Sequence, residues 1–288
     1  MTNTQAKPVI FGCGATSLTQ AEKDFFAKHQ PFGFILFARN IDNPEQLKKL
    51  IGELNDSVMH KPEILVDQEG GRVQRLTTPH WPKHPATATY TTEKAAFDGA
   101  KQIAIELAEV GFTVNCAPML DVRAPEAHDI IGDRAFSDDP KIVAKLGKAF
   151  AEGLVAGGVK PVIKHIPGHG RSTCDSHHDL PRVCASREQL EIDFFPFKAL
   201  KDEPYAMTAH IIYEAIDAEN CTTQSKAVID LIRNDIGFTG LIMTDDLSMK
   251  ALTGTFAERT RKSLEAGCDL ILHCNGDMAE MIEIAEAI

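Results

Sequence analysis

The sequence predicts an α/β fold, namely a (β/α)8 barrel of the TIM type that forms a single domain over residues 1–288. Eight short apolar runs recur along the chain, and each is followed by a stretch with helical periodicity. Alternating strands and helices favour a parallel sheet with helices packed against it. No Ser- and Gly-rich linker divides the chain, and barrels of about 250 residues fold as one unit. Eight such units therefore predict a closed barrel rather than an open sheet.

The apolar runs are rich in Val, Ile, Leu and Phe, as expected for parallel strands that are buried on both faces. Such strands all end at one mouth of a barrel, where the active sites of this fold are built. The predicted strands are Pro8–Cys13, Phe32–Phe37, Ile64–Asp67, Thr113–Pro118, Val159–His165, Tyr205–His210, Leu241–Asp245 and Leu270–Cys274.

Local signals mark the ends of several predicted helices. Asn43 and Asp139 each stand before a proline, which favours a helix that starts at that proline. Glycines such as Gly111 and Gly267 stand where helices should end. The predicted helices include Glu45–Val58, Glu93–Val110, Pro140–Ala156, Arg187–Leu200 and Met278–Ile288.

Composition and charge limit the classes of partner. The formal net charge of −11 would repel a phosphate backbone, and no cluster of Lys and Arg offsets it, which argues against nucleic acid. No apolar stretch approaches the roughly 20 residues of a membrane span, and no secretory signal is visible, so we expect a cytoplasmic protein without a membrane partner. Seven cysteines without a Cys-x-x-Cys pair also favour a reducing compartment, and we expect most of them to be buried as small apolar side chains.

The seventh predicted strand ends on two adjacent carboxylates, Asp245 and Asp246. An Asp at such a position commonly caps the helix that follows. At the mouth of a barrel, a carboxylate can instead point into the pocket and take part in chemistry. Only one of two neighbours can point into the pocket, so the other would cap the helix or support the first. The residues alone leave open which of the two does so.

The loop after the fifth strand is long and rich in histidine. Between Lys164 and Asp179 it holds four His and two Asp residues, which is far from chance for a solvated loop. Asp175 can accept a hydrogen bond from the ring N–H of His177, which fixes the tautomer and raises the basicity of the imidazole. This pair is our candidate for proton transfer. We expect His178 and the Asp that follows it to be surface residues.

Two other kinds of chemistry are compatible with parts of this pattern. Clusters of His and Asp at barrel mouths also bind Zn or Fe, but the sequence has neither a His-Glu-x-x-His motif nor a His-x-His pair on the first strand. A non-standard metal site remains open. Lys164, near the end of a strand, could form a Schiff base as in an aldolase, but the carboxylates and the loop histidines would then have no role.

Acids and arginines follow the third strand. Asp67 can accept hydrogen bonds from two neighbouring sugar hydroxyls, and Arg75 can donate to others. For Glu69 and Arg72, an internal network of ion pairs that holds the long loop is an equally good interpretation.

Taken together, these segments resemble glycoside hydrolase family 3, in its branch of single-domain bacterial β-N-acetylhexosaminidases. The Asp-Ser-His element that begins at Asp175 distinguishes this branch. Members often extend beyond the position of Ile288, which leaves the packing of the last helix open. The other segments that carry the resemblance are Gly33–Asn40, Val66–Arg75, Ala117–Val122, Ile131–Phe136, Lys164–Gly170, Met207–His210 and the nucleophile signature, Leu231–Asp235 with Gly240–Ser248.

The resemblance implies roles for individual residues. The acid directly after the Ser or Thr of the signature is the family's nucleophile, which is Asp245 here, and His177 with Asp175 would form the acid/base group. Neither a metal nor a cofactor is implied. The residues that would contact the hydroxyls and the N-acetyl sugar in the specificity pocket are Asp67, Arg75, Arg134, Lys164 and His165.

The implied activity is that of a retaining exo-β-N-acetylglucosaminidase that acts through a covalent glycosyl-enzyme. Its small-molecule substrate would carry a terminal, non-reducing, β-linked N-acetylglucosamine, as in the anhydro-muropeptides of peptidoglycan recycling. The residues alone indicate only a β-glycoside. The alternatives are a metal-dependent TIM-barrel hydrolase and a sugar-binding protein without turnover.

Overall fold

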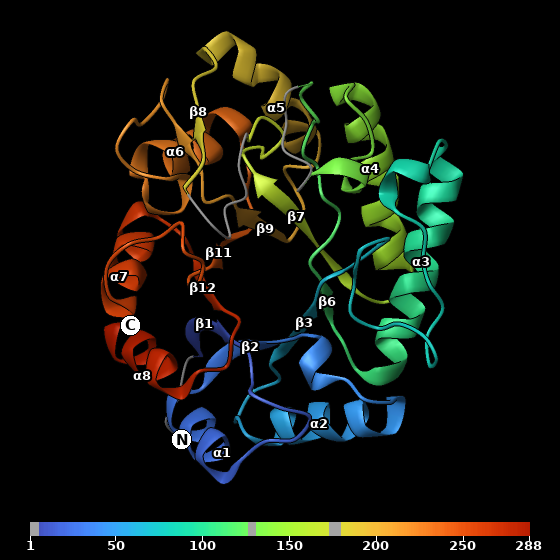
Figure 1. The fold of residues 1–288 in the computed structure, drawn as a ribbon, viewed down its shortest axis with the longest axis vertical. Coiled ribbons are helices and arrows are strands. Elements are labelled where there is room, and N and C mark those ends of the chain that lie inside the picture. Colours follow the sequence, from blue (N-terminus) through green and yellow to red (C-terminus); the bar gives the residue numbers. More distant parts are fainter. Residues whose placement is uncertain (1–5, 126–130, 173–179) are drawn as a thin grey trace.

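The computed structural model describes residues 6–125, 131–172 and 180–288. In these residues eight parallel strands close into a barrel in the order β1-β12-β11-β9-β7-β6-β3-β2, with helices around it (Figure 1). The predicted (β/α)8 barrel is therefore confirmed. The strands are β1 (Lys7–Phe11), β2 (Pro31–Leu36), β3 (Glu63–Val66), β6 (Val114–Asn115), β7 (Lys160–Ile166), β9 (Tyr205–Thr208), β11 (Leu241–Asp246) and β12 (Leu270–His273).

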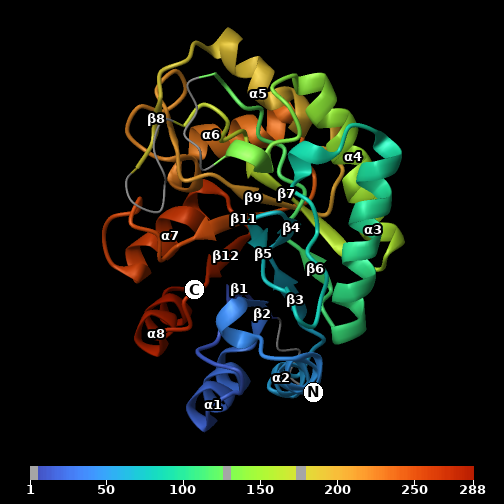
Figure 2. The ribbon, with the colours of Figure 1, turned by 45° about the vertical axis from the view of Figure 1, so that its right-hand side comes forward.

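Helices follow the barrel strands along the chain and lie outside the barrel (Figure 2). The side chains of Asn43 and Asp139 accept hydrogen bonds from the backbone N–H groups of Gln46 and Lys141, so both predicted helix starts are confirmed. The helices are α1 (Gln20–His29), α2 (Pro44–Asp56), α3 (Glu93–Val110), α4 (Pro140–Ala156), α5 (Arg187–Ala199), α6 (Lys226–Leu231), α7 (Phe256–Ala266) and α8 (Met278–Ala287).

Side chains alternate between the two faces of each barrel strand, as the two-residue repeat of a strand requires. On β1, Ile10 belongs to the core inside the barrel, whereas Val9 and Phe11 belong to the core between barrel and helices. Both faces are buried, which explains why the strands read as nearly continuous apolar runs. The inner core also includes Ile35, Leu65, Val114, Val162, Met243 and Leu272.

The fourth barrel strand is shorter than predicted. β6 comprises only Val114–Asn115, because Pro118 has no N–H with which to continue the ladder. The segment nevertheless stays beside β7, where the N–H of Leu120 donates to the carbonyl of Lys164 at 2.6 Å. This contact brings the following residue, Asp121, to the mouth of the barrel.

The loops at the mouth contain short elements that the sequence did not predict, because two or three residues carry no visible periodicity. β4 (Gln68–Gly70) pairs antiparallel with β5 (Val73–Gln74), and β8 (Arg182–Val183) pairs parallel with β10 (Ile212–Tyr213). Single turns complete the loops, namely the 3-10 helices η1 (Ala38–Asn40), η2 (Thr87–Thr89), η3 (Gly132–Arg134) and η4 (Thr222–Gln224) and the π-helix η5 (Ile232–Ile236).

The described cysteines behave largely as expected. Five of these six thiols are free and buried, and Cys184 is free and exposed. Burial raises the pKa of the Cys13 thiol to about 12, so this thiol is protonated and acts as a small apolar group. No helix in the described ranges has both the length and the apolar character that a membrane span requires.

The packing of α3 against α4 leads to a first prediction. A Cβ atom on Gly153 would lie 2.3 Å from the carbonyl oxygen of Phe97 and 2.9 Å from the Cβ of Ala100, so Gly153→Ala must push the two helices apart. We expect a loss of about 1–3 kcal/mol in the free energy of unfolding, measured in urea. Gly52→Ala in α2 is the control, because its Cβ would meet no atom within 4 Å, and we expect a gain of about 0.5–1 kcal/mol. Equal effects of the two changes would contradict this account.

Candidate active site

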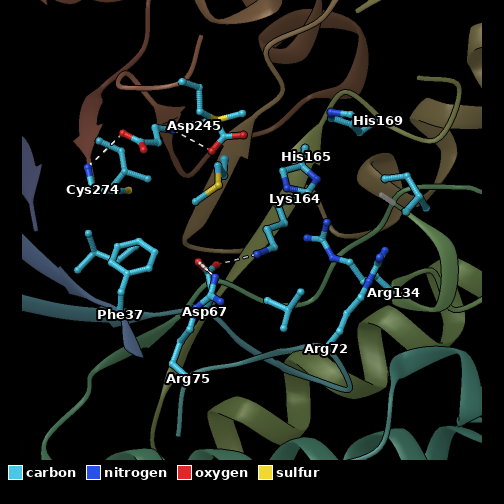
Figure 3. Close-up of a pocket in the computed structure, with 17 residues that line it drawn as sticks. Phe37, Asp67, Arg72, Arg75, Arg134, Lys164, His165, His169, Asp245 and Cys274 are labelled. Carbon is cyan, nitrogen blue, oxygen red and sulfur yellow. Dashed lines mark hydrogen bonds and ion pairs between the residues drawn. The ribbon is translucent and has the colours of Figure 1, made fainter. Parts of the chain in front are cut away.

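Polar side chains at the carboxyl ends of the strands surround a cavity of about 300 Å³ (Figure 3). This volume lies at the lower end of the range for small-ligand pockets. Asp245 and the five predicted pocket residues all lie at this one cavity. The cavity is lined by the acids Asp67, Asp245 and Asp246, the cations Arg72, Arg75, Arg134 and Lys164, the imidazoles His165 and His169, and the less polar side chains Ile35, Phe37, Val73, Ile131, Met207, Met249, Leu272 and Cys274.

A network of buried ion pairs forms one wall of the cavity. The ammonium group of Lys164 lies 2.9 Å from one oxygen of Asp67 and 2.6 Å from an oxygen of Glu69. The guanidinium group of Arg134 donates two hydrogen bonds to Glu69, of 2.9 and 2.8 Å. Arg75 lies 3.3 Å from the second oxygen of Asp67. Each carboxylate of the network therefore faces two cations.

Opposite charges decide the protonation of these groups. Burial disfavours the charged form of Glu69, but Arg134 and Lys164 outweigh it and lower the pKa of the carboxyl. Lys164 and Arg75 lower the pKa of Asp67 in the same way, again against burial. Burial also disfavours the charged form of Lys164, but the two carboxylates outweigh it and raise the pKa of the ammonium group. A lysine held as ammonium is a poor nucleophile, which argues against the aldolase alternative.

The end of β7 is irregular, and this irregularity shapes the cavity. The register of β7 against β9 shifts between Lys164 and Ile166. Adjacent side chains of a regular strand face opposite sides, but here Lys164 and His165 both reach the cavity. The shift therefore allows one strand to supply a cation and an imidazole to the same wall.

Asp121 fixes the orientation of His165. Its carboxylate is fully buried and accepts hydrogen bonds from the ring Nδ1 of His165 at 2.7 Å and from the backbone N–H of the same residue at 3.2 Å. It also accepts the N–H of His169 at 2.6 Å. Burial opposes ionisation of Asp121, but His165 outweighs it and lowers the pKa of the carboxyl. With Nδ1 bound to Asp121, the ring presents its opposite edge and Nε2 to the cavity.

His169 is a second imidazole at this wall. Its ring centroid lies 5.4 Å from that of His165, and the two rings meet edge to face. Burial, assisted by the neighbouring His165, lowers the pKa of His169 to about 4, so its ring is neutral at neutral pH.

The two carboxylates at the end of β11 have different surroundings. Asp246 accepts hydrogen bonds from the backbone N–H and the hydroxyl of Ser248, at 3.0 and 2.6 Å, and from the N–H of Cys274 at 3.1 Å. Its carboxylate therefore holds the turn after β11 against the end of β12. Asp245 accepts the N–H of Asp246 at 2.8 Å and lies across the opening from Asp67 in Figure 3. These surroundings leave Asp245 as the better candidate for a reactive carboxylate.

The predicted proton-transfer pair, Asp175 and His177, lies outside the described residues, as do His178 and Asp179. Their roles therefore stay predictions. The described chain leads to this segment from the cavity wall, since the N–H of Ser172 donates to the carbonyl of His169 at 3.1 Å.

Several residues at the cavity or directly behind its wall were not assigned by the sequence. Asp121 follows an apolar run that ends at Leu120, which is the same signal that singled out Asp67. Phe37 ends a predicted strand, and its ring lies 5.0 and 5.5 Å from the guanidinium carbons of Arg39 and Arg75. An aromatic side chain in an apolar strand carries no pattern that separates a pocket residue from the core.

The interpretation as an internal network of ion pairs is confirmed for Glu69, which pairs with Arg134 and Lys164. Arg72 lies 3.3 Å from Asp133, but this pair is about half exposed and Arg72 also lines the cavity. The described part of the chain contains no group of three or more His, Cys, Asp or Glu side chains that could hold a metal ion.

The chain is similar to proteins of known family. Residues 9–288 match the family model described as the glycosyl hydrolase family 3 N terminal domain. A β-hexosaminidase of Neisseria meningitidis serogroup B is 37% identical over 287 residues, which cover 93% of this chain and 78% of that protein. A β-hexosaminidase of Alkalilimnicola ehrlichii is 36% identical over 284 residues and 80% of its own length.

Solved structures agree with these relatives. The crystal structure of NagZ from Neisseria gonorrhoeae in complex with N-trifluoroacetyl-D-glucosamine has a TM-score of 0.91 and 35% identity, and the match covers 98% of this chain and 85% of that one. A family 3 β-N-acetylglucosaminidase from Paenibacillus has a TM-score of 0.91 and 31% identity, with 97% and 56% covered.

The buried network gives a second prediction. Glu69→Gln keeps the shape of the side chain but leaves Arg134 and Lys164 with one partner charge fewer, so we expect a loss of about 3–5 kcal/mol in the free energy of unfolding at pH 7. Because the pKa of Glu69 is lowered by folding, its contribution is complete above the unfolded pKa of about 4.3 and is lost as the pH falls below it. The difference in the free energy of unfolding between wild type and variant should therefore become smaller as the pH is lowered.

The control for this prediction is Glu93→Gln, because Glu93 pairs with Lys145 at 3.0 Å on the surface, with both side chains more than half exposed. We expect that change to lower the free energy of unfolding by less than about 1 kcal/mol. A Glu69→Gln protein as stable as the control, or a difference that grows at low pH, would show that the network does not stabilise the fold.

Proposed function

The chain belongs to glycosyl hydrolase family 3, and from this premise we propose that it is a retaining exo-β-N-acetylglucosaminidase. The observation that carries the proposal is the position of the Asp245 carboxylate at a small cavity, opposite a wall of fixed ion pairs. The relatives named β-hexosaminidase and the similar β-N-acetylglucosaminidase structures support the same activity. A cavity of about 300 Å³ suits a single sugar ring, and so favours removal of a terminal residue.

The wall of ion pairs provides the groups that would hold the sugar. Asp67 accepts hydrogen bonds from Lys164 and Arg75, and its remaining lone pairs can accept hydrogen bonds from neighbouring hydroxyls of the sugar. Arg134 and Lys164 can donate to sugar oxygens from positions that the buried carboxylates fix in advance. His165, oriented by its hydrogen bond from Nδ1, would present Nε2 to a hydroxyl. Binding then requires little reorganisation of the protein.

In the proposed reaction, the Asp245 carboxylate attacks the anomeric carbon while the bond to the leaving oxygen breaks. His177, oriented by Asp175, donates a proton to that oxygen. Water then attacks the anomeric carbon of the glycosyl-enzyme and gives a proton back to His177, and the Asp245 carboxylate is released. Two inversions at one carbon give net retention of the β-configuration.

The proposal extends to the physiological substrate and the compartment. We propose that the substrate is an anhydro-muropeptide that carries a terminal β-linked N-acetylglucosamine, and that the protein acts on it in the cytoplasm during peptidoglycan recycling. The free thiols of the described cysteines are compatible with a reducing compartment. The N-trifluoroacetyl-D-glucosamine complex of the Neisseria gonorrhoeae protein supports an amino sugar in this type of site.

The nucleophile assignment gives a third prediction. Asp245→Asn should lower kcat on a chromogenic β-N-acetylglucosaminide by several orders of magnitude, because the amide cannot form the glycosyl ester. The thermal unfolding temperature should change little. Asp246→Asn should instead lower mainly the thermal unfolding temperature, since this carboxylate accepts hydrogen bonds from Ser248 and Cys274. If Asp246→Asn abolishes turnover while Asp245→Asn retains it, the assignment is wrong.

A fourth prediction separates this activity from its two alternatives. Turnover of the chromogenic substrate should be unaffected by a chelator, and a fluorinated N-acetylglucosaminyl donor should label Asp245, located by mass spectrometry of the digested protein. Turnover that the chelator removes would instead support a metal-dependent hydrolase. Tight binding of N-acetylglucosamine without turnover would support a sugar-binding protein.

A further inference from the structure

A closed chain of hydrogen bonds surrounds the backbone of the proposed nucleophile. The N–H of Asp245 donates to the hydroxyl of Thr208 at 3.3 Å, and this hydroxyl lies 2.8 Å from that of Thr223. The Thr223 hydroxyl lies 2.7 Å from Nδ1 of His210, whose Nε2 lies 3.0 Å from the carbonyl oxygen of Asp246. The three side chains are fully buried, and none of them lines the cavity.

The directions of these hydrogen bonds follow from elementary chemistry. The carbonyl of Asp246 can only accept, so Nε2 of His210 carries a proton. Burial lowers the pKa of His210, so the ring is neutral and Nδ1 accepts the hydroxyl proton of Thr223. The oxygen of Thr223 then accepts from Thr208, whose own oxygen accepts from Asp245. The Thr223 hydroxyl also lies 3.3 Å from the carbonyl oxygen of Ala209, but if it donated there, Nδ1 of the neutral His210 ring would lose the donor that lies 2.7 Å from it.

The position of these hydrogen bonds in the fold explains why they are needed. The backbone ladder between β9 and β11 ends with the pair Met207 and Met243. Beyond this pair, the register of β11 against β12 also shifts before Asp246. The backbone that carries Asp245 is therefore held by side chains from the end of β9 and from η4 rather than by a regular sheet.

We propose that Thr208, Thr223 and His210 are positioning residues. They fix the Asp245 carboxylate because their hydrogen bonds hold the backbone N–H of Asp245 and the backbone carbonyl of Asp246. This inference rests on the proposed role of Asp245 as nucleophile. A carboxylate attached to a clamped backbone keeps its distance to the anomeric carbon, and an error of about 1 Å in such a distance can cost a factor of about 100 in rate.

The test is the isosteric change Thr223→Val, which removes the central hydroxyl without touching the cavity. We expect kcat on the chromogenic β-N-acetylglucosaminide to fall by about 10- to 100-fold, with KM little changed. Thr223→Ser restores a hydroxyl at the same place and should recover most of the activity. Thr222→Val is the matched control, because Thr222 is the adjacent buried threonine and its hydroxyl donates, among the described residues, only to the carbonyl of Ile211, at 3.3 Å.

Thr222→Val should leave kcat close to the wild-type value, even if the two Val variants lose similar stability. An unchanged kcat in Thr223→Val, or an equal loss in Thr222→Val, overturns the proposal. If Thr223→Val does not fold, Thr208→Val makes the same prediction, since it removes the acceptor of the Asp245 N–H. If neither variant folds, the chain of hydrogen bonds is needed for fold stability, and this outcome would also overturn the proposal.

The labelling experiment separates this inference from the proposed function. A fluorinated N-acetylglucosaminyl donor that labels a residue other than Asp245 in the wild type contradicts the function itself. A donor that labels Asp245 in the wild type and at the same rate in Thr223→Val contradicts only the positioning role. Slower labelling of Asp245 in Thr223→Val, at unchanged donor affinity, supports it.

Discussion

The cavity depends on the pairing of charges that the fold has removed from water. Lys164 and Glu69 are almost fully buried, and a buried charge without a partner costs several kcal/mol. Their pairs with Asp67 and Arg134 remove that cost only if β3, η3 and the end of β7 keep fixed relative positions. The same requirement that makes the network costly to break makes the wall of the cavity rigid. Rigid donors and acceptors are what a hydroxyl-rich ligand needs.

Much of the fold was predictable because the barrel strands are buried on both faces and several helices carry their own end signals. α3 and α4 have the predicted bounds, since Thr92 and Asp139 cap their starts and glycines end them. The pairing of β8 with β10 was not predictable, because it joins two loops that become neighbours only after the barrel has closed. The early end of β6 has a different cause, since Pro118 lies in its own sequence and has no N–H with which to continue the ladder.

The site was predictable where a polar residue interrupts an apolar run at a strand end, as at Asp67 and Asp245. Residues that act through a neighbour were harder to identify. Asp121 is important because it accepts from both nitrogen donors of His165, and that contact depends on the irregular end of β7. The adjacent acids at the end of β11 show the same limit, because Asp246 is distinguished by hydrogen bonds that it accepts from Ser248 and Cys274, and these contacts form only in the folded chain.

The charges at the mouth also bear on how a ligand arrives there. Among the described residues that line the cavity or stand directly behind its wall, five carboxylates face four cations, so the local formal charge is only −1, although the whole chain carries a net charge of −11. These residues are Asp67, Glu69, Asp121, Asp245 and Asp246 against Arg72, Arg75, Arg134 and Lys164. An uncharged sugar ring would approach an opening with little net charge. Its capture would then be governed by diffusion and shape, with little dependence on ionic strength.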